Sequence, residues 1–148
     1  MMGTTWYFVS TSTNHRRDEG SVRTIREAKI IGETPRKWIL REAEQIAEEA
    51  AGAERGWRPP PAPGEGWYDW TIPKKGGGMR EARTCERQKT YTRPFFESLE
   101  LAQAHLANLE AQAWASKNNY KIARVVETCT DATVMRQIAE LVGWKEQK

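Results

Sequence analysis

A tight turn between two apolar runs is the sequence feature that most restricts how this chain can fold. In IIGETPRKWIL, residues 30–40, the polar segment GETP separates one apolar run from another that begins at Trp38. Gly and Pro favour a turn, and the β-branched and aromatic residues around them favour strands. We therefore predict an antiparallel hairpin with strands at about 22–32 and 36–42, preceded by a first strand at Trp6–Thr11.

Trp38 follows two basic residues, Arg36 and Lys37, and its position allows two interpretations. The indole carries so much apolar area that packing on the sheet is one. In the other, the ring forms a flat wall beside two cations, on which a charged ring system stacks. The sequence leaves both open.

Helical spacing of apolar residues appears in three later segments. Residues 41–52 place Ala43, Ile46 and Ala50 on one face, and Gly52 follows as a stop. Ser98 is the expected N-cap of a long helix, and Asp131, with Thr130, caps a last helix that Gly143 ends. Between these elements we predict one strand at 82–93, closed by Pro94.

The long helix carries two apolar stripes that face opposite sides. The first comprises Leu99, Ala102, Leu106, Leu109 and Ala113, and the second comprises Ile122, Val125, Val126 and Cys129. Either the helix breaks at 116–119, where two asparagines favour a turn, or it continues and buries a different face in each half. A continuous helix suggests packing against a second chain and hence a homo-oligomer.

Together these elements predict an α+β fold with a small N-terminal antiparallel sheet packed against C-terminal helices. We expect a single domain, 1–148, with an ordered insertion rich in Pro, Gly and Trp at about 53–79. No apolar run approaches the roughly 18 residues that span a bilayer, and the N-terminus lacks the features of a signal peptide. We therefore expect a cytoplasmic protein that does not contact a membrane.

The sequence offers few parts for catalysis. His15 and His105 lie in unrelated settings, and HExxH, P-loop, GxSxG and GxGxxG motifs are absent. Cys85 and Cys129 form no CxxC pair, so we expect free thiols. We predict no enzyme, no metal site and no cofactor.

Aromatic residues interleaved with basic and amide residues point to ligand binding instead. The chain has seven tryptophans, and its net charge of +3 conceals basic clusters in the first third and in the middle. Rings stack on bases, and Arg and Lys neutralise phosphates. If the long helix continues, Asn118, Lys121 and Arg124 form a polar ridge, which is either a binding surface or an ordinary solvent-facing strip.

The segment IIGETPRKWIL and the C-terminal segment KIARVVETCTDATVMRQIAELVGW resemble parts of small accessory proteins of tailed phages. Among these, the order of sheet and helices is most similar to the phage sponge proteins that counter the Thoeris defence system. That resemblance implies an oligomer that sequesters a cyclic ADP-ribose-type immune signal in the host cytoplasm without cleaving it. It also implies a pocket between chains, lined by aromatics, arginines and an asparagine.

On this hypothesis the ligand is a small anionic nucleotide. Trp38, Phe95 or Trp114 supplies the stacking surface. Arg36, Lys37 and Arg124 contact phosphate, and Asn118 or Asn119 contacts the base or ribose beside Lys121. Two alternatives stay open: a nucleic-acid-binding phage accessory protein, and a protein-binding inhibitor of a host defence complex.

Overall fold

The computed structural model describes residues 2–13, 21–66, 68–86 and 88–145. His15, which the sequence placed in a loop, and Trp67 of the predicted insertion lie outside these residues. The chain divides into two compact units, Met1–Asn108 and Leu109–Lys148.

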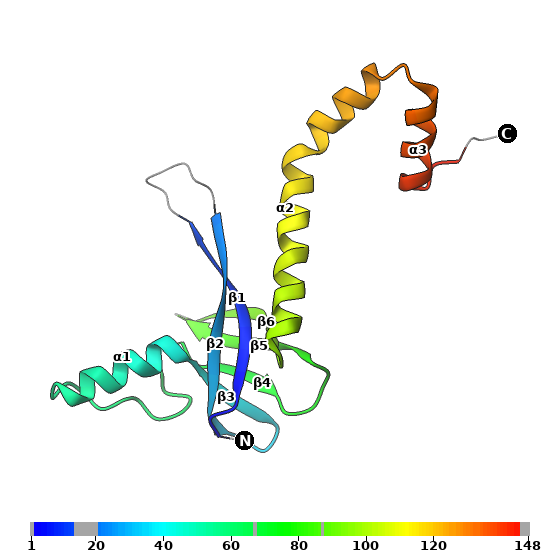
Figure 1. Cartoon of the computed structure of the whole chain (residues 1–148). Helices are drawn as coiled ribbons and strands as arrows, with labels where there is room; N and C mark the ends of the chain where they lie inside the picture. The colour runs from blue at the N-terminus through cyan, green and yellow to red at the C-terminus, as the bar shows by residue number, and fades with distance from the viewer. Residues whose placement is uncertain (1, 14–20, 67, 87, 146–148) are drawn as a thin grey trace. The chain divides into compact units, whose positions relative to one another are not determined.

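A closed antiparallel β-barrel forms the first unit (Figure 1). Its six strands in the described residues are β1 (Thr5–Thr13), β2 (Ser21–Glu33), β3 (Lys37–Glu42), β4 (Trp70–Pro73), β5 (Met79–Glu86) and β6 (Lys89–Phe96). Each strand pairs with the next, and β6 returns to β1, where Tyr7 pairs with Phe96. The α+β class is confirmed, but the small N-terminal sheet is wrong, because the sheet closes on itself and extends to Phe96.

Two pairs of neighbouring strands in the barrel are joined by few paired residues. In the described residues, β1 and β6 are joined only by the pair Tyr7 and Phe96, and β4 and β5 only by the pair Thr71 and Arg83. The hairpin β5–β6, by contrast, pairs along its whole length from Met79 to Glu86. The barrel wall thus consists of β1–β4 on one side and the β5–β6 hairpin on the other.

The predicted strand at 82–93 is wrong, because this stretch contains parts of β5 and β6 with a turn between them. Gln88 adopts φ 68° in that turn, a left-handed conformation that non-glycine residues rarely take. Pro94 lies inside β6, opposite Glu81, and does not close the strand.

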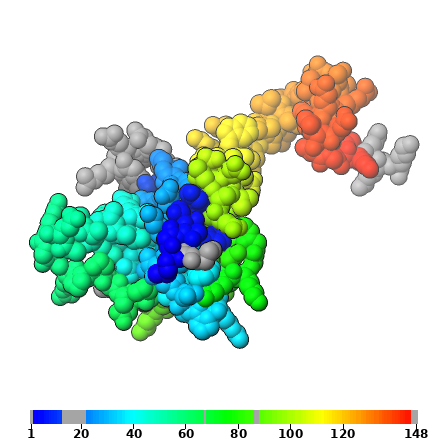
Figure 2. Space-filling model, turned by 60° about the horizontal axis from the view of Figure 1, so that its bottom comes forward, coloured from blue at the N-terminus to red at the C-terminus, as the bar shows by residue number. Residues whose placement is uncertain are grey.

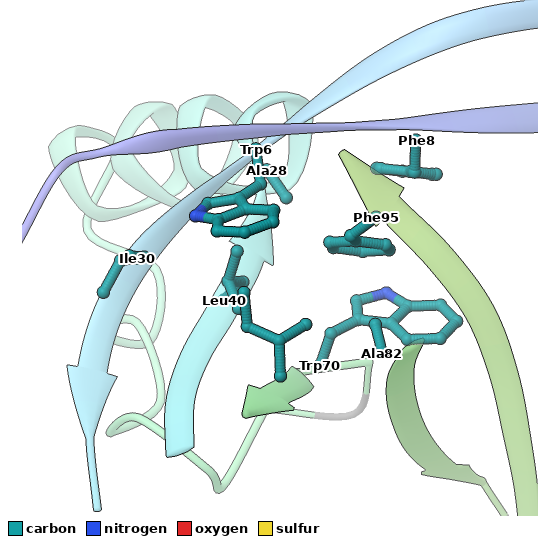
Figure 3. Close-up of a cluster of buried hydrophobic side chains, with 9 residues drawn as sticks. Trp6, Phe8, Ala28, Ile30, Leu40, Trp70, Ala82 and Phe95 are labelled. Atoms are coloured by element: carbon teal, nitrogen blue, oxygen red, sulfur yellow. The ribbon is translucent and has the colours of Figure 1, made fainter. Parts of the chain in front are cut away.

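Inward-facing aromatic rings fill the barrel. Phe8 and Phe95 stack with centroids 4.9 Å apart, and the Trp70 ring lies 5.3 Å from Phe95. Figure 3 shows these three rings one above another, with Trp6 and Leu40 beside them. The core cluster is Trp6, Phe8, Ala28, Ile30, Leu40, Trp70, Ile72, Ala82 and Phe95. A barrel of this size leaves no room along its axis once such side chains fill it.

The hairpin β2–β3 confirms the first sequence prediction. Its turn is held by Thr34, whose backbone N–H donates to the Lys37 carbonyl at 2.8 Å and whose Oγ1 accepts from Lys37 N at 3.1 Å. Trp38 is half-buried against the core, and the Lys74 ammonium lies 4.5 Å from its ring centroid. The packing interpretation of Trp38 is therefore correct, and a cation of the chain itself covers its ring.

The helix α1 (Ala43–Glu54) and the segment after it project from one side of the barrel, cyan to green in Figure 2. The predicted insertion at about 53–79 extends too far, since β4 and the first residue of β5 belong to the barrel wall. Within this stretch Trp70 lies in the barrel core, Trp57 is exposed, and Pro63 approaches β2. A Cβ on Gly32 would lie 2.6 Å from Cβ of Pro63, so only glycine permits this contact.

The helices α2 (Leu99–Thr128) and α3 (Ala132–Val142) follow the barrel. Ser98 Oγ accepts from Leu101 N at 3.3 Å, and Asp131 Oδ1 caps α3 by accepting from Thr133 N at 2.9 Å. Both predicted caps are thus confirmed, as is Gly143 as the left-handed C-cap, with φ 74°. On the barrel side of α2, Ala102 is fully buried and His105 packs its ring 4.9 Å from Phe96.

The continuous form of α2 is the correct alternative, because the helix passes through 116–119 without a break. Asn118 does not make a turn. Its Nδ2 donates to the Trp114 carbonyl, one turn earlier, at 2.8 Å. In the described residues no helix is long and apolar enough to cross a membrane.

Candidate ligand-binding site at the barrel mouth

The residues predicted to bind the ligand fall in three places. Arg36 and Lys37 are exposed on the β2–β3 turn beside Trp38. Phe95 has no exposed surface and lies in the core between Phe8 and Trp70. Its predicted role as a stacking platform is therefore corrected, because no ligand reaches this ring without unfolding the barrel.

The other predicted residues belong to α2, in the second unit. Trp114 is 62% exposed, and Arg124 holds its guanidinium 5.4 Å from the Tyr120 ring. Asn118 is half-buried, with its amide bonded to the helix backbone. Asn119 and Lys121 are exposed. The polar ridge thus exists, since the helix is continuous, but a ligand role for it stays a prediction.

The structure reveals a different concave site at one open end of the barrel. Side chains alternate along a strand, so Ser10 follows Phe8 on the inner side of β1, and Arg93 precedes Phe95 on the inner side of β6. They border a cavity of about 350 Å³ with Trp70 in its lining. We call this the barrel mouth and define it by Ser10, Glu42, Tyr68, Thr84, Tyr91 and Arg93.

Arg93 is the cation of the mouth. Its guanidinium carbon lies 5.2 Å from the Phe8 ring centroid and 5.4 Å from that of Trp70. The two rings hold the group by cation–π attraction. Arg93 forms no hydrogen bond or ion pair with any residue that the structure describes. Its N–H donors therefore stay available for a carboxylate or phosphate, which guanidinium binds through paired hydrogen bonds.

The opposite wall of the mouth carries acidic residues. Glu42 accepts a hydrogen bond from Arg26 at 3.3 Å, and Arg26 also lies 3.5 Å from Glu44. Glu42 and Tyr68 line both the mouth and an adjoining cleft of about 570 Å³, to which Glu48 and other residues of α1 contribute. The site therefore combines a donor-rich cation, a carboxylate acceptor and two tyrosines in one lining.

A buried ion pair holds the Tyr68 side of the mouth in place. Arg41 Nε donates to Asp69 Oδ1 at 2.7 Å and Nη2 donates to Oδ2 at 2.8 Å, and both side chains are 4% exposed. Arg41 also donates to Glu49 at 3.0 Å and to the Pro61 carbonyl at 3.2 Å. The hydrogen bond to the Asp69 carboxylate raises the pKa of Arg41 above its usual value, so the guanidinium stays charged.

The same ion pair orders the chain just before Tyr68. Asp69 Oδ2 accepts from the backbone N–H groups of Gly64 and Gly66 at 3.0 and 3.2 Å. A Cβ on Gly66 would lie 2.6 Å from Asp69 Oδ1. Because Asp69 directly precedes β4, this clamp couples the segment after α1 to the barrel wall.

Trp70, in the lining of the mouth, carries a buried donor without a conventional acceptor among the described residues. Trp70 is 6% exposed, and its Nε1 has no hydrogen-bond partner in the residues that the structure describes. In Figure 3 this nitrogen lies on the side of the indole nearest the Phe95 ring. An N–H group over an aromatic face gains only a weak interaction, so the indole orientation is set by packing in the core.

One pattern in the sequence could have located the mouth, but the predictions above did not use it. In KTYTRPFF, residues 89–96, Tyr91, Arg93 and Phe95 occupy alternate positions. Strand alternation puts all three on one face, and depth along the barrel separates the buried ring from the two residues at the open end. The tyrosine and the arginine are thus accessible where the phenylalanine is not.

No protein-family model, no curated protein and no solved structure matches this chain. In the described residues, no group of three or more His, Cys, Asp or Glu side chains is placed to hold a metal ion. The assignment of a function therefore rests on the geometry of the barrel and its mouth.

Proposed function

We propose that this protein binds a small anionic nucleotide in the barrel mouth and releases it unchanged. The observation that carries the proposal is Arg93, a half-buried guanidinium over two rings without a carboxylate partner in the described chain. Ligand sites in proteins range over roughly 300–1,000 Å³ and combine apolar walls with a few polar groups. A cavity of about 350 Å³ with a Trp in its lining fits a ligand at the small end of that range.

The chemistry of the walls favours a nucleotide over a simple carboxylate. Arg93 suits a phosphate, and Tyr91 and Tyr68, which are 46% and 43% exposed, offer faces for a base. Glu42, on the far wall, accepts hydrogen bonds of the kind that an exocyclic amino group donates. A nucleotide with its phosphate toward β6 and its base toward α1 satisfies all three surfaces.

The resemblance to phage sponge proteins supplies the specific form of the proposal. In that form the ligand is a cyclic nucleotide-type immune signal, such as a cyclic ADP-ribose isomer. The protein sequesters it in an infected host cell and thereby acts against the defence system. The mouth then takes over the stacking role first predicted for Phe95.

Calorimetric titration against cyclic mononucleotides, cyclic dinucleotides and ADP-ribose cyclisation products tests this proposal. We expect binding of at least one of them and recovery of the intact compound after denaturation of the complex. Arg93→Gln should weaken that binding by at least about tenfold, since charge-assisted hydrogen bonds contribute about 1.5–3 kcal/mol. Arg83→Gln is the matched control, because Arg83 is exposed, belongs to the same hairpin and lies near Glu81.

Three results contradict the proposal. One is no heat with any member of the panel. Another is equal weakening by Arg93→Gln and Arg83→Gln, which indicates general electrostatics and not the mouth. The third is a chemically altered ligand, which indicates an enzyme. Binding to DNA or RNA that falls steeply with salt, as counterion release requires, favours the nucleic-acid alternative.

A further inference from the structure

Glu42 is a second charged side chain of the barrel mouth and lies at the end of the inner face of β3. Leu40, two residues earlier, is fully buried in the core, and alternation along the strand places Glu42 on the same face. Glu42 also pairs in register with the buried Ala28 of β2. Its side chain borders both the mouth and the adjoining cleft of about 570 Å³. Glu42 therefore lies where a ligand in the mouth extends toward α1.

Glu42 and Arg93 line the same cavity but do not pair with each other. In the described residues, Glu42 Oε2 accepts one hydrogen bond, from Arg26 Nη1 at 3.3 Å, and Oε1 accepts none. The same part of the chain offers Arg93 no hydrogen-bond or ionic partner. A ligand in this cavity of about 350 Å³ satisfies both groups if it places an anion at Arg93 and a hydrogen-bond donor at Glu42.

The spacing of the two groups suits the two ends of a nucleotide. The Arg93 guanidinium carbon lies 5.4 Å from the Trp70 ring centroid, and Trp70 pairs in register with Leu40. Glu42 follows Leu40 by two residues, a distance of about 7 Å along a strand. One nucleotide can therefore contact Arg93 with its phosphate and Glu42 with its base.

The charges of the adjoining cleft indicate which end of the ligand lies at Glu42. Beyond Glu42, the described lining of the cleft includes the carboxylates of Glu44, Glu48 and Glu49, and Arg26 is its one cation. Arg26 already binds Glu42 and lies 3.5 Å from Glu44. A phosphate in the cleft would face like charges, whereas the amino group of a base meets hydrogen-bond acceptors.

We propose that Glu42 determines which base the mouth accepts and selects bases with an exocyclic amino group over their keto counterparts. This inference rests on the proposed function of the mouth and adds the class of base to it. A carboxylate offers only acceptors, so it bonds to the amino group of adenine. Hypoxanthine carries a keto oxygen at the same position, and binding it leaves Glu42 and that oxygen unpaired.

Titration of matched ligands that differ only in this group tests the selectivity. Each nucleotide of the calorimetric panel is paired with its deaminated form, adenine with hypoxanthine, cytosine with uracil and guanine with xanthine. Cyclic AMP and cyclic IMP are one such pair. We expect the amino member to bind at least about tenfold more tightly, since its deaminated form leaves a polar group of the site without a partner.

Three variants of the whole chain assign the preference to Glu42. Glu42→Gln should reduce it to within about threefold, because the glutamine amide both donates and accepts. Glu44→Gln is the matched control and should keep the preference, since Glu44 also lies near Arg26 but borders only the cleft. Arg93→Gln should weaken both members of a pair equally, because the phosphate contact does not distinguish bases.

Circular dichroism shows whether each variant keeps its fold. If Glu42→Gln does not fold, Glu42→Asp keeps the charge but withdraws the carboxylate by one methylene group, and it should lower the preference by at least about threefold. Equal affinity for the amino and deaminated members overturns the inference. A preference that folded Glu42→Gln retains also overturns it, and so does an equal loss of preference in Glu44→Gln.

Failure of this inference differs from failure of the proposed function. If both members of a pair bind equally and Arg93→Gln weakens both, the mouth binds nucleotides but Glu42 does not select the base. If no member of any pair binds, the proposed function itself is wrong, and the base specificity is wrong with it.

Discussion

Replacement of Asp69 by alanine should lower the free energy of unfolding by about 3 kcal/mol, the lower end of the cost of breaking one partner of a buried ion pair. The carboxylate of Asp69 accepts two hydrogen bonds from Arg41 and two from the backbone. With the methyl group of alanine in its place, a guanidinium that is 4% exposed loses its closest counter-charge. The carbonyl of Pro61 and the carboxylate of Glu49 still bind it, so the loss stays short of the maximum.

Urea unfolding of Asp69→Ala beside Glu81→Ala measures this effect against a matched control. Glu81 is also a carboxylate near an arginine, but its side chain is 60% exposed and lies 3.6 Å from Arg83. Surface pairs of this kind contribute little, so Glu81→Ala should change the free energy of unfolding by less than about 0.5 kcal/mol. Equal effects of the two changes would show that the Arg41 clamp does not hold the fold.

Replacement of Phe95 by alanine should have the larger effect, a loss of about 4 kcal/mol. The ring has no exposed surface and contacts Phe8 and Trp70 in the column of the core. Truncation of a buried Phe to Ala costs about 3–5 kcal/mol, because it removes buried apolar area and leaves a cavity. If Phe95→Ala does not fold, Phe95→Leu should still fold with a smaller loss, since leucine refills most of the space.

Tyr91→Ala is the matched control for this change. Tyr91 lies on the same strand and the same face, but at the mouth, where it is 46% exposed. Its truncation should alter the free energy of unfolding by no more than about 1 kcal/mol and should weaken ligand binding instead. The opposite pattern, with stability lost at Tyr91 and binding lost at Phe95, would return the stacking role to the phenylalanine.

The sequence predicted correctly those elements whose first or last residues have a strong local preference, such as a side chain that caps a helix or a glycine that ends one. The β2–β3 hairpin, the Asp131 cap and the left-handed Gly143 occur as predicted, but the turn of the hairpin begins later than Gly32, because Gly32 and Glu33 pair within β2. Closure of the barrel was not predictable in this way. It depends on β4, a four-residue strand with Trp70 and Ile72 directed inward, within a stretch whose Pro and Gly content indicates a loop. The β5–β6 turn also contains no glycine, and the residue that adopts a left-handed conformation there is Gln88.

The residue types of the candidate site could be read from the sequence, but their accessibility could not. In KTYTRPFF, Tyr91 and Arg93 line the mouth, whereas Phe95, the residue chosen from this segment, is buried. Which ring is accessible depends on depth along the barrel, a tertiary property that alternation alone does not give. In the same way, two adjacent asparagines favour a turn in isolation, but in α2 Asn118 bonds to the carbonyl of Trp114 and the helix continues.

The two single-pair junctions of the barrel have a consequence for how the wall opens. In the described residues, the β5–β6 hairpin has one register pair with each neighbouring strand. Side-chain hydrogen bonds, such as that from Thr84 to the Asp69 carbonyl, add to the β4 side. We therefore expect the junction of β6 with β1 to be the part of the wall whose amides exchange soonest with solvent. Thr84, Tyr91 and Arg93 belong to this hairpin, whereas Ser10 and Glu42 belong to the four strands opposite. A ligand that contacts both groups of residues therefore links the hairpin to the rest of the wall. Its binding should slow amide exchange most in the β5–β6 hairpin.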